Sequence, residues 1–197
     1  IGAEGTLGIV TAASLRLFPH PAQMVTALTA VPSPEAALTL LGHMQARTGG
    51  LLSSFELVSR PTLEMVLRHI PNTRDPMETP SPWYVLMEIS GGAGASLEAL
   101  TQSALEEAAG EELLTDAVVA QNQAQARSFW HMRETISEAE KREGVSIKHD
   151  ISVPVASIPA FIAEATGVVV KKFPGARPIC FGHMGDGNIH YNISQPV

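Results

Sequence analysis

The sequence predicts an α+β fold, a ferredoxin-like antiparallel sheet with helices covering one face, truncated at both ends. Two successive β-α-β passages between residues 25 and 120 predict this class, because split units of this kind place their strands in one antiparallel sheet. Hydrophobic residues make up 45% of the 197 positions, which is enough for a sizeable core. The chain begins on Ile1 without a methionine and stops at Val197 just after a strand-like run, so we expect the protein to continue at both ends.

The first half contains a domain boundary and the two β-α-β passages. Residues 8–18 read as a strand that ends at a stiff segment around Pro19 and Pro21. We therefore predict that residues 1–22 close one domain and that residues 23–197 form a second domain, incomplete at its C-terminus. Apolar runs then predict strands, and capping residues and prolines predict helices and a loop, in this order: strand 25–31, helix 33–48 capped by Ser33, strand 51–58, helix 60–70, proline-rich loop 71–82, strand 83–90, helix 96–109 and strand 116–120.

The second half predicts a long helix and a terminal hairpin. The helix is expected from Asn122 to Arg142, with Gly144 as its stop. A strand at 145–153, a helix at 157–172 with Ser157 as N-cap, and a hairpin at 178–193 are expected after it.

Charge and cysteine content narrow the function classes. A formal charge of −7 with only 13 Lys and Arg argues against a nucleic-acid partner and favours small-molecule chemistry. The chain lacks an apolar run near the roughly 20 residues that span a bilayer, so we expect no transmembrane segment. The single cysteine, Cys180, excludes a disulfide within the chain and fits a reducing, cytoplasmic location.

The hairpin carries the most specific signal. If Asp186-Gly187 is a two-residue turn, His183 pairs with His190, and a four-residue loop at 185–188 keeps the same register. Directly opposed side chains have Cβ atoms roughly 4.5–5.5 Å apart, which suits two imidazoles on one cation. Alternation places Cys180, Met184, Ile189, Tyr191 and Ile193 on one face and Phe181, His183, His190 and Asn192 on the other. The alternative is a hairpin whose histidines make ordinary hydrogen bonds, and a metal site would need a third ligand beyond Val197.

A second candidate site lies on the long helix and the strand after it. Arg133 and Ser137 are four residues apart, so they share a helix face, and an arginine with a hydroxyl is a natural carboxylate clamp. Lys148 supplies a further positive charge. Taken alone, these residues fit a solvated helix with surface ion pairs better, and Asp150 is then only a partner for Lys148.

The glycine-rich start allows a close backbone approach to a flat ligand. Gly2, Gly5 and Gly8 lack the spacing of a dinucleotide fingerprint, and a strand follows them where that fingerprint has a helix. A tight turn is the default interpretation.

Together these motifs resemble the FAD-linked oxidases of the vanillyl-alcohol oxidase superfamily, in its D-lactate and D-2-hydroxyglutarate dehydrogenase branch. Residues 1–11 (IGAEGTLGIVT) resemble the end of the family's flavin domain. Residues 130–134 (WHMRE) and 148–154 (KHDISVP) are similar to its substrate-domain motifs, and residues 181–192 (FGHMGDGNIHYN) to its metal-binding hairpin.

The resemblance implies a role for each matching residue. His183 and His190 would bind a divalent metal, usually zinc, and Arg133, Ser137 and Lys148 would hold substrate carboxylates. Asn192 would lie near substrate and flavin. The flavin would also be approached by a set of amino-terminal residues: Gly2, Glu4, Gly5, Gly8 and Ile9.

The resemblance further implies an enzyme of which this chain is a part. FAD would be bound mainly by a domain before Ile1, and a Glu-His segment after Val197 would supply the third metal ligand and a catalytic histidine, so the fragment alone is expected to be inactive. The enzyme would oxidise a D-2-hydroxyacid of the lactate, 2-hydroxyglutarate or glycolate type by metal-assisted hydride transfer to flavin. The candidates for its electron acceptor would be an electron-transfer protein, a cytochrome or a quinone, and a second copy of the chain is a further candidate partner. The alternatives are a metal-dependent hydrolase and a non-catalytic ferredoxin-like module.

Overall fold

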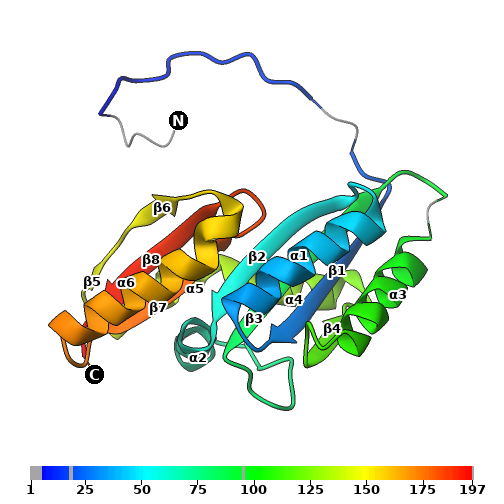
Figure 1. Cartoon of the computed structure of the whole chain (residues 1–197). Coiled ribbons are helices and arrows are strands. Elements are labelled where there is room, and N and C mark those ends of the chain that lie inside the picture. The colour runs from blue at the N-terminus through cyan, green and yellow to red at the C-terminus, as the bar shows by residue number, and fades with distance from the viewer. Residues whose placement is uncertain (1–5, 18–19, 95, 197) are drawn as a thin grey trace.

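The structure is a computed structural model that describes residues 6–17, 20–94 and 96–196 (Figure 1). The first half of the sheet-forming chain alternates strands and helices in the expected order. Its elements are β1 (Gln23–Val31), α1 (Pro34–Thr48), β2 (Leu52–Ser59), α2 (Arg60–His69), β3 (Trp83–Gly91), α3 (Leu97–Gly110) and β4 (Asp116–Val119). The second half contributes α4 (Gln123–Glu134), α5 (Ile136–Glu143), β5 (Ser146–Ile147), β6 (Asp150–Ser152), the 3-10 helix η1 (Val155–Ser157), α6 (Ile158–Lys172), β7 (Arg177–His183) and β8 (Asn188–Ser194).

Within the described residues, all strands join one antiparallel sheet. Its order is β4-β1-β3-β2-β7-β8-β5, and β6 also pairs with β8. The β4-β1-β3-β2 half has the interleaved arrangement that two β-α-β passages predict, so the α+β class with an antiparallel sheet is confirmed. The pairing of β2 with β7 sets Glu56 opposite His183 and joins the two halves into one sheet.

Helices lie on both faces of the sheet, where the sequence predicted one covered face. Figure 1 shows α1 and α6 on the viewer's side and α4 and α5 behind the strands. One core cluster joins α1, α3 and α6 to the sheet, and the other joins α2, α4 and α5 to it. The prediction was wrong because α2, α4 and α5 each bury apolar residues, such as Val66, Phe129 and Ile136, against the second face.

Local signals explain where the helices begin and end. The Ser33 hydroxyl accepts a hydrogen bond from the Ala36 N–H at 3.2 Å and caps α1, as expected. Gly49 then ends α1 with φ 60°. Ser157 stands at the start of α6 but makes no capping hydrogen bond through its side chain, because its backbone is helical.

The predicted helix 122–142 is divided at Thr135. There α4 ends and α5 begins, and the Thr135 hydroxyl donates to the His131 carbonyl at 2.6 Å. A threonine hydroxyl that competes for a helix carbonyl favours a bend of this kind. Asn122 and Gly144 do bound the pair, as expected.

The predicted strand at 8–18 is not formed by residues 8–17, and residue 18 lies outside the described residues. This segment runs away from the sheet as an extended trace (Figure 1), with Ile9 and Leu17 more than 85% exposed. A strand needs a partner for its backbone groups, and the described part of the sheet offers it none. None of the helices in the described ranges is both long and apolar enough to cross a membrane.

Candidate functional site

The hairpin β7–β8 closes with a four-residue turn at 184–187, so its register differs from the predicted one. His183 pairs with Asn188, and Phe181 pairs with His190. The turn is fixed by Asp186, whose carboxylate accepts the Asn188 N–H at 3.1 Å, and by Gly187, which adopts φ 87°. The direct pairing of His183 with His190 was therefore wrong, in both of its proposed loop forms.

The two faces of the hairpin are nevertheless as predicted. Four of the expected apolar residues (Cys180, Met184, Ile189 and Tyr191) are buried in one core cluster, against which Ile193 packs. His183 and His190 share the opposite face as diagonal neighbours, whose Cα atoms are typically about 7–8 Å apart. Phe181 lies on that face too, its ring centroid 4.7 Å from that of His190.

Each histidine is held by a carboxylate through Nδ1. His183 Nδ1 bonds to the nearly buried carboxylate of Glu56, and His190 Nδ1 bonds to Asp150. Such a bond fixes the tautomer and leaves Nε2 as the free acceptor, which is the arrangement of most metal-binding histidines. The donor set thus fits two ligands of a metal site, although the described residues contain no cluster of three or more His, Cys, Asp or Glu able to hold a metal.

Arg133 belongs to the His183 side of this surface. Its Nε donates to Glu56 Oε2 at 2.8 Å, so Glu56 bridges Arg133 and His183. Its guanidinium carbon lies 4.9 Å from the centroid of the Phe181 ring. The prediction grouped Arg133 with Ser137 and Lys148. Arg133 contacts Phe181, which lines one pocket with Ser137 and Lys148, but Arg133 does not line that pocket itself.

The remaining predicted residues meet in one pocket of about 360 Å³. It is lined by Ser137, Lys148, Asp150, Phe181, His190 and Asn192. These residues come from α5, the β5–β6 segment and both strands of the hairpin. Lys148 does not pair with Asp150 but with Glu140, at 2.9 Å from Nζ to Oε2, because Asp150 is taken by His190.

Sequence reasoning missed Glu56 and Glu140, the two buried carboxylates beneath the site. Glu56 lies in an apolar strand and Glu140 in a charged run of helix, where an acid ordinarily faces solvent. The available signal for Glu56 was a lone acid inside the apolar run Phe55–Val58, which favours a paired buried charge. Glu140 offers no comparable signal.

The side chain of Asn192 interrupts the pairing of β8 with the edge strands β5 and β6. Its Oδ1 accepts the His149 N–H at 3.0 Å, and its Nδ2 donates to Glu140 at 3.0 Å. The register of β5 and β6 against β8 is continuous across this break, so Lys148 falls opposite Asn192. The predicted strand 145–153 is therefore present as β5 and β6 with a side-chain amide between them.

Two ionisable groups outside the pocket, Cys180 and Glu143, have shifted pKa values, and the causes of these shifts indicate structural roles. Burial raises the pKa of the Cys180 thiol to about 12, which keeps it protonated and unreactive. Burial alone would raise the pKa of Glu143, but hydrogen bonds from His69 and Arg177 and the charges of Arg177 and Arg68 lower it below its ordinary value. Glu143 thus ties α2 and β7 to the end of α5.

The amino-terminal candidates are not tested by this geometry. Gly2, Glu4 and Gly5 lie outside the described residues. Gly8 has φ 145° with open space around it, and Ile9 is 89% exposed.

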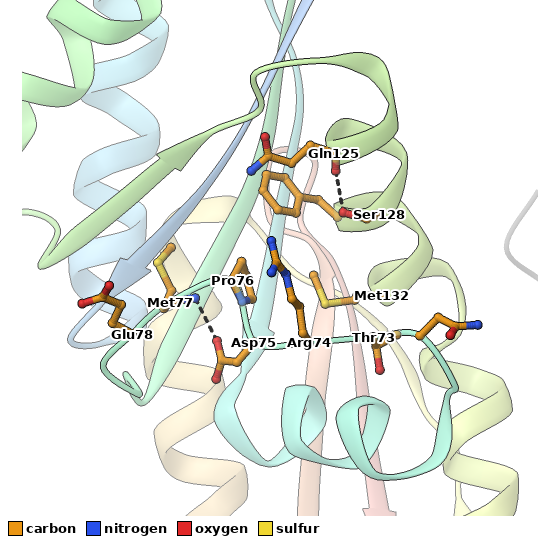
Figure 2. A pocket seen from close by; sticks show the side chains of 11 residues that line it. Thr73, Arg74, Asp75, Pro76, Met77, Glu78, Gln125, Ser128 and Met132 are labelled. Atoms are coloured by element: carbon orange, nitrogen blue, oxygen red, sulfur yellow. Dashed lines mark hydrogen bonds between the residues drawn. The ribbon is translucent and has the colours of Figure 1, made fainter.

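A further pocket of about 400 Å³ lies on the same face of the sheet but contains none of the predicted site residues. Figure 2 shows its two walls, the proline-rich loop with Thr73–Glu78 on one side and Gln125, Ser128 and Met132 of α4 on the other. Its acid Asp75 is engaged by Arg60 at 2.5 Å and by the Met77 N–H at 3.1 Å. These contacts of Asp75 hold the loop wall in place. Several of the predicted site residues line the smaller pocket instead.

Comparison with known proteins assigns the chain to a family. Residues 20–197 match the model of FAD linked oxidases, C-terminal domain. A D-2-hydroxyglutarate dehydrogenase of Xanthomonas citri pv. viticola is 36% identical over 196 residues, covering 100% of this chain and 40% of that protein. The mitochondrial D-2-hydroxyglutarate dehydrogenase of Arabidopsis thaliana is 34% identical, covering 98% of this chain and 34% of that protein. The chain therefore spans about two fifths or less of these curated relatives.

Solved structures share the fold at low sequence identity. An alkyldihydroxyacetonephosphate synthase aligns over 98% of this chain and 40% of its own, with a TM-score of 0.58 and 15% identity. A p-cresol methylhydroxylase with substrate bound aligns over 91% of this chain and 40% of its own, with a TM-score of 0.62 and 10% identity. At these identities the likeness is one of fold alone.

Proposed function

Because the chain belongs to the family of FAD-linked oxidase C-terminal domains, as its resemblance indicated, we propose that it is the substrate-binding region of a flavoenzyme that oxidises a D-2-hydroxyacid. The observation that carries the proposal is the pocket in which Ser137, Lys148 and Asn192 converge beside His190. Relatives named D-2-hydroxyglutarate dehydrogenases support this substrate class.

The pocket supplies hydrogen-bond donors to an acid. A carboxylate only accepts hydrogen bonds, and the hydroxyl of Ser137, the ammonium of Lys148 and the amide Nδ2 of Asn192 are donors at its wall. Arg133 has used one of its five donors on Glu56 and keeps the rest for a second acidic group. These residues would bind and orient the substrate, a role that can lower a barrier by several kcal/mol.

Two groups from outside the chain complete the proposal. A divalent metal, zinc as the usual choice, would be held by His183 and His190 through Nε2 and would polarise the substrate hydroxyl. FAD, bound mainly by a domain that we place before residue 1, would accept the hydride from C2. Within this chain, Glu56 and Asp150 keep the two imidazoles oriented for such a metal.

We assign residues 1–22 to the end of that flavin domain. The exposed apolar side chains of Leu7, Ile9, Leu15 and Leu17 support this, since such residues are ordinarily covered by a partner surface. Gly2, Glu4, Gly5, Gly8 and Ile9 remain the proposed flavin contacts. The electron acceptor, a homodimer and a cytoplasmic location also remain predictions, and a tagged protein followed in cells tests the last of them.

The test uses the full-length protein. We expect wild type to contain zinc and flavin, and D-2-hydroxyglutarate, D-lactate or glycolate to bleach the flavin absorbance. The double variant His183→Ala with His190→Ala should retain flavin but lose zinc and reducibility. His131→Ala, which removes an exposed histidine from α4, is the matched control and should behave as wild type. A wild type free of flavin, or reduced by none of these acids, would overturn the proposal.

A further inference from the structure

Glu140 is a fully buried acid directly beneath the pocket. None of its surface is exposed, and it lies on α5 one turn beyond the pocket residue Ser137. Its Oε2 accepts one hydrogen bond from Lys148 Nζ at 2.9 Å and another from Asn192 Nδ2 at 3.0 Å. Its Oε1 finds no hydrogen-bond partner among the described side chains and backbone groups. Both partners of Glu140 are thus residues to which we assign substrate binding.

The two contacts of Asn192 fix the direction of its amide. Oδ1 is held by the His149 N–H and Nδ2 by Glu140, so a flipped amide would set donor against donor and oxygen against carboxylate. Nδ2 carries a second hydrogen, which remains available to the pocket that Asn192 lines. Without Glu140, the amide would be held at one end only.

The position of the Lys148 ammonium group depends on the same oxygen, Oε2 of Glu140. Its side chain is 48% exposed, and a flexible lysine with this exposure samples many rotamers unless its ammonium is held. Glu140 holds Nζ on the side of the strand that faces Asn192, which lies opposite Lys148 in the continued register. One carboxylate oxygen therefore sets two donors at one wall of the pocket.

The stability of the fold gives little reason for burying Glu140. A buried ion pair is weak evidence for stability, because the cost of desolvation offsets the attraction, and an unpaired buried oxygen adds to that cost. Polar groups retained under such conditions gather at functional sites.

We propose that Glu140 is a positioning residue of the substrate site, which aims the amide of Asn192 and the ammonium of Lys148 at the substrate carboxylate. The proposal rests on the proposed function and extends it to a residue that does not itself touch substrate. In Glu140→Gln the remaining side-chain oxygen is an uncharged acceptor, so it holds the Lys148 ammonium and the Asn192 amide less strongly than the carboxylate does.

The kinetic test compares Glu140→Gln with Glu138→Gln in the full-length enzyme. Glu138 lies on the same helix, is 54% exposed and pairs only with Arg142 at 2.5 Å in the described contacts. We expect KM for the acid that reduces the wild-type flavin to rise about tenfold or more in Glu140→Gln, with a smaller change in kcat and a thermal midpoint close to wild type. The effect should be non-additive with Lys148→Met, since both changes act on one contact. An unchanged KM, or additive effects of the two substitutions, would overturn the positioning role.

A second measurement is independent of activity. Acetylation of Lys148 by acetic anhydride, followed by mass spectrometry, should be slower than that of the exposed Lys141 in wild type and in Glu138→Gln. Glu140→Gln should raise the Lys148 rate severalfold and leave Lys141 unchanged. If no 2-hydroxyacid reduces the wild type, the proposed function fails while this labelling still decides on Glu140; equal Lys148 rates in wild type and Glu140→Gln would overturn it.

Discussion

Gly187 is the position at which one added methyl group should disturb the site most. Its backbone has φ 87°, and a Cβ built there would lie 2.2 Å from the carbonyl oxygen of Val153, at the end of the strand that carries Asp150. The same two residues are joined by a hydrogen bond of 3.1 Å from the Val153 N–H to the Gly187 carbonyl. In Gly187→Ala the strand must retreat by about 1 Å to reach an ordinary contact distance, so this bond is lost.

The cost follows from two contributions. A left-handed backbone costs an L-residue about 1–2 kcal/mol relative to glycine. The lost hydrogen bond contributes about 0.5–1.5 kcal/mol. We therefore expect Gly187→Ala to destabilise the β6–β8 pairing by about 1.5–3.5 kcal/mol.

Hydrogen exchange of the β6 amides in the full-length protein measures this locally. A loss of about 1.5–3.5 kcal/mol should speed their exchange by about 10- to 300-fold, because about 1.4 kcal/mol corresponds to a factor of ten. Gly42→Ala is the control: Gly42 is an exposed residue of α1 with nothing within 4 Å of the new Cβ, and the change should stabilise the helix by about 0.5–1 kcal/mol. Exchange of the β6 amides within threefold of wild type in Gly187→Ala would refute the reasoning.

Three further outcomes are expected. Asp150→Asn should weaken zinc binding about 10- to 100-fold in a chelator competition, because Asp150 orients His190, whereas replacing the exposed Asp116 of β4 with Asn should not; equal affinities would remove Asp150 from the site. The lowered pKa of Glu143 means that its stabilising effect is complete above the ordinary carboxyl pKa and is lost as pH falls through the lowered value. Urea unfolding of wild type and Glu143→Gln should therefore differ at neutral pH and converge in acid; a constant difference would contradict this. Cys180, whose pKa is raised to about 12, should react with a thiol reagent at pH 8 only when the protein unfolds, and rapid labelling of folded protein would show that the thiol is accessible.

Much of the fold was predictable because its signals are local. The apolar runs and the Ser33 and Gly49 ends placed β1, α1 and the elements after them, and their alternation gave the antiparallel order of β1–β4. The second helical layer was missed because a single sequence does not show which sheet face an amphipathic helix covers. The strand predicted at 8–18 failed because strand formation depends on a partner, which local pattern does not contain.

The sequence brought several candidate residues together, although their roles stay predictions and part of their expected geometry was wrong. Pattern and resemblance named Ser137, Lys148, His190 and Asn192, and these meet in one pocket. The histidine register was wrong because the four-residue turn, closed by the Asp186 side chain, lies at 184–187, one residue earlier than the 185–188 loop that would have paired the two histidines. Glu140 was missed because only the tertiary fold buries it against Lys148 and Asn192.

The insertion of the Asn192 amide into the pairing of β5 and β6 with β8 also bears on whether other chains can pair with this edge of the sheet. The segment forms one border of the described sheet, and its Val145 and Ile147 side chains are 76% and 62% exposed. A long, flat, apolar border strand invites pairing with other chains, and proteins counter this with short strands and charges, lysine above all. Here the amide divides the border into pieces of two and three residues with Lys148 between them. The Asn192 side chain thus also makes this border a poor template for aggregation.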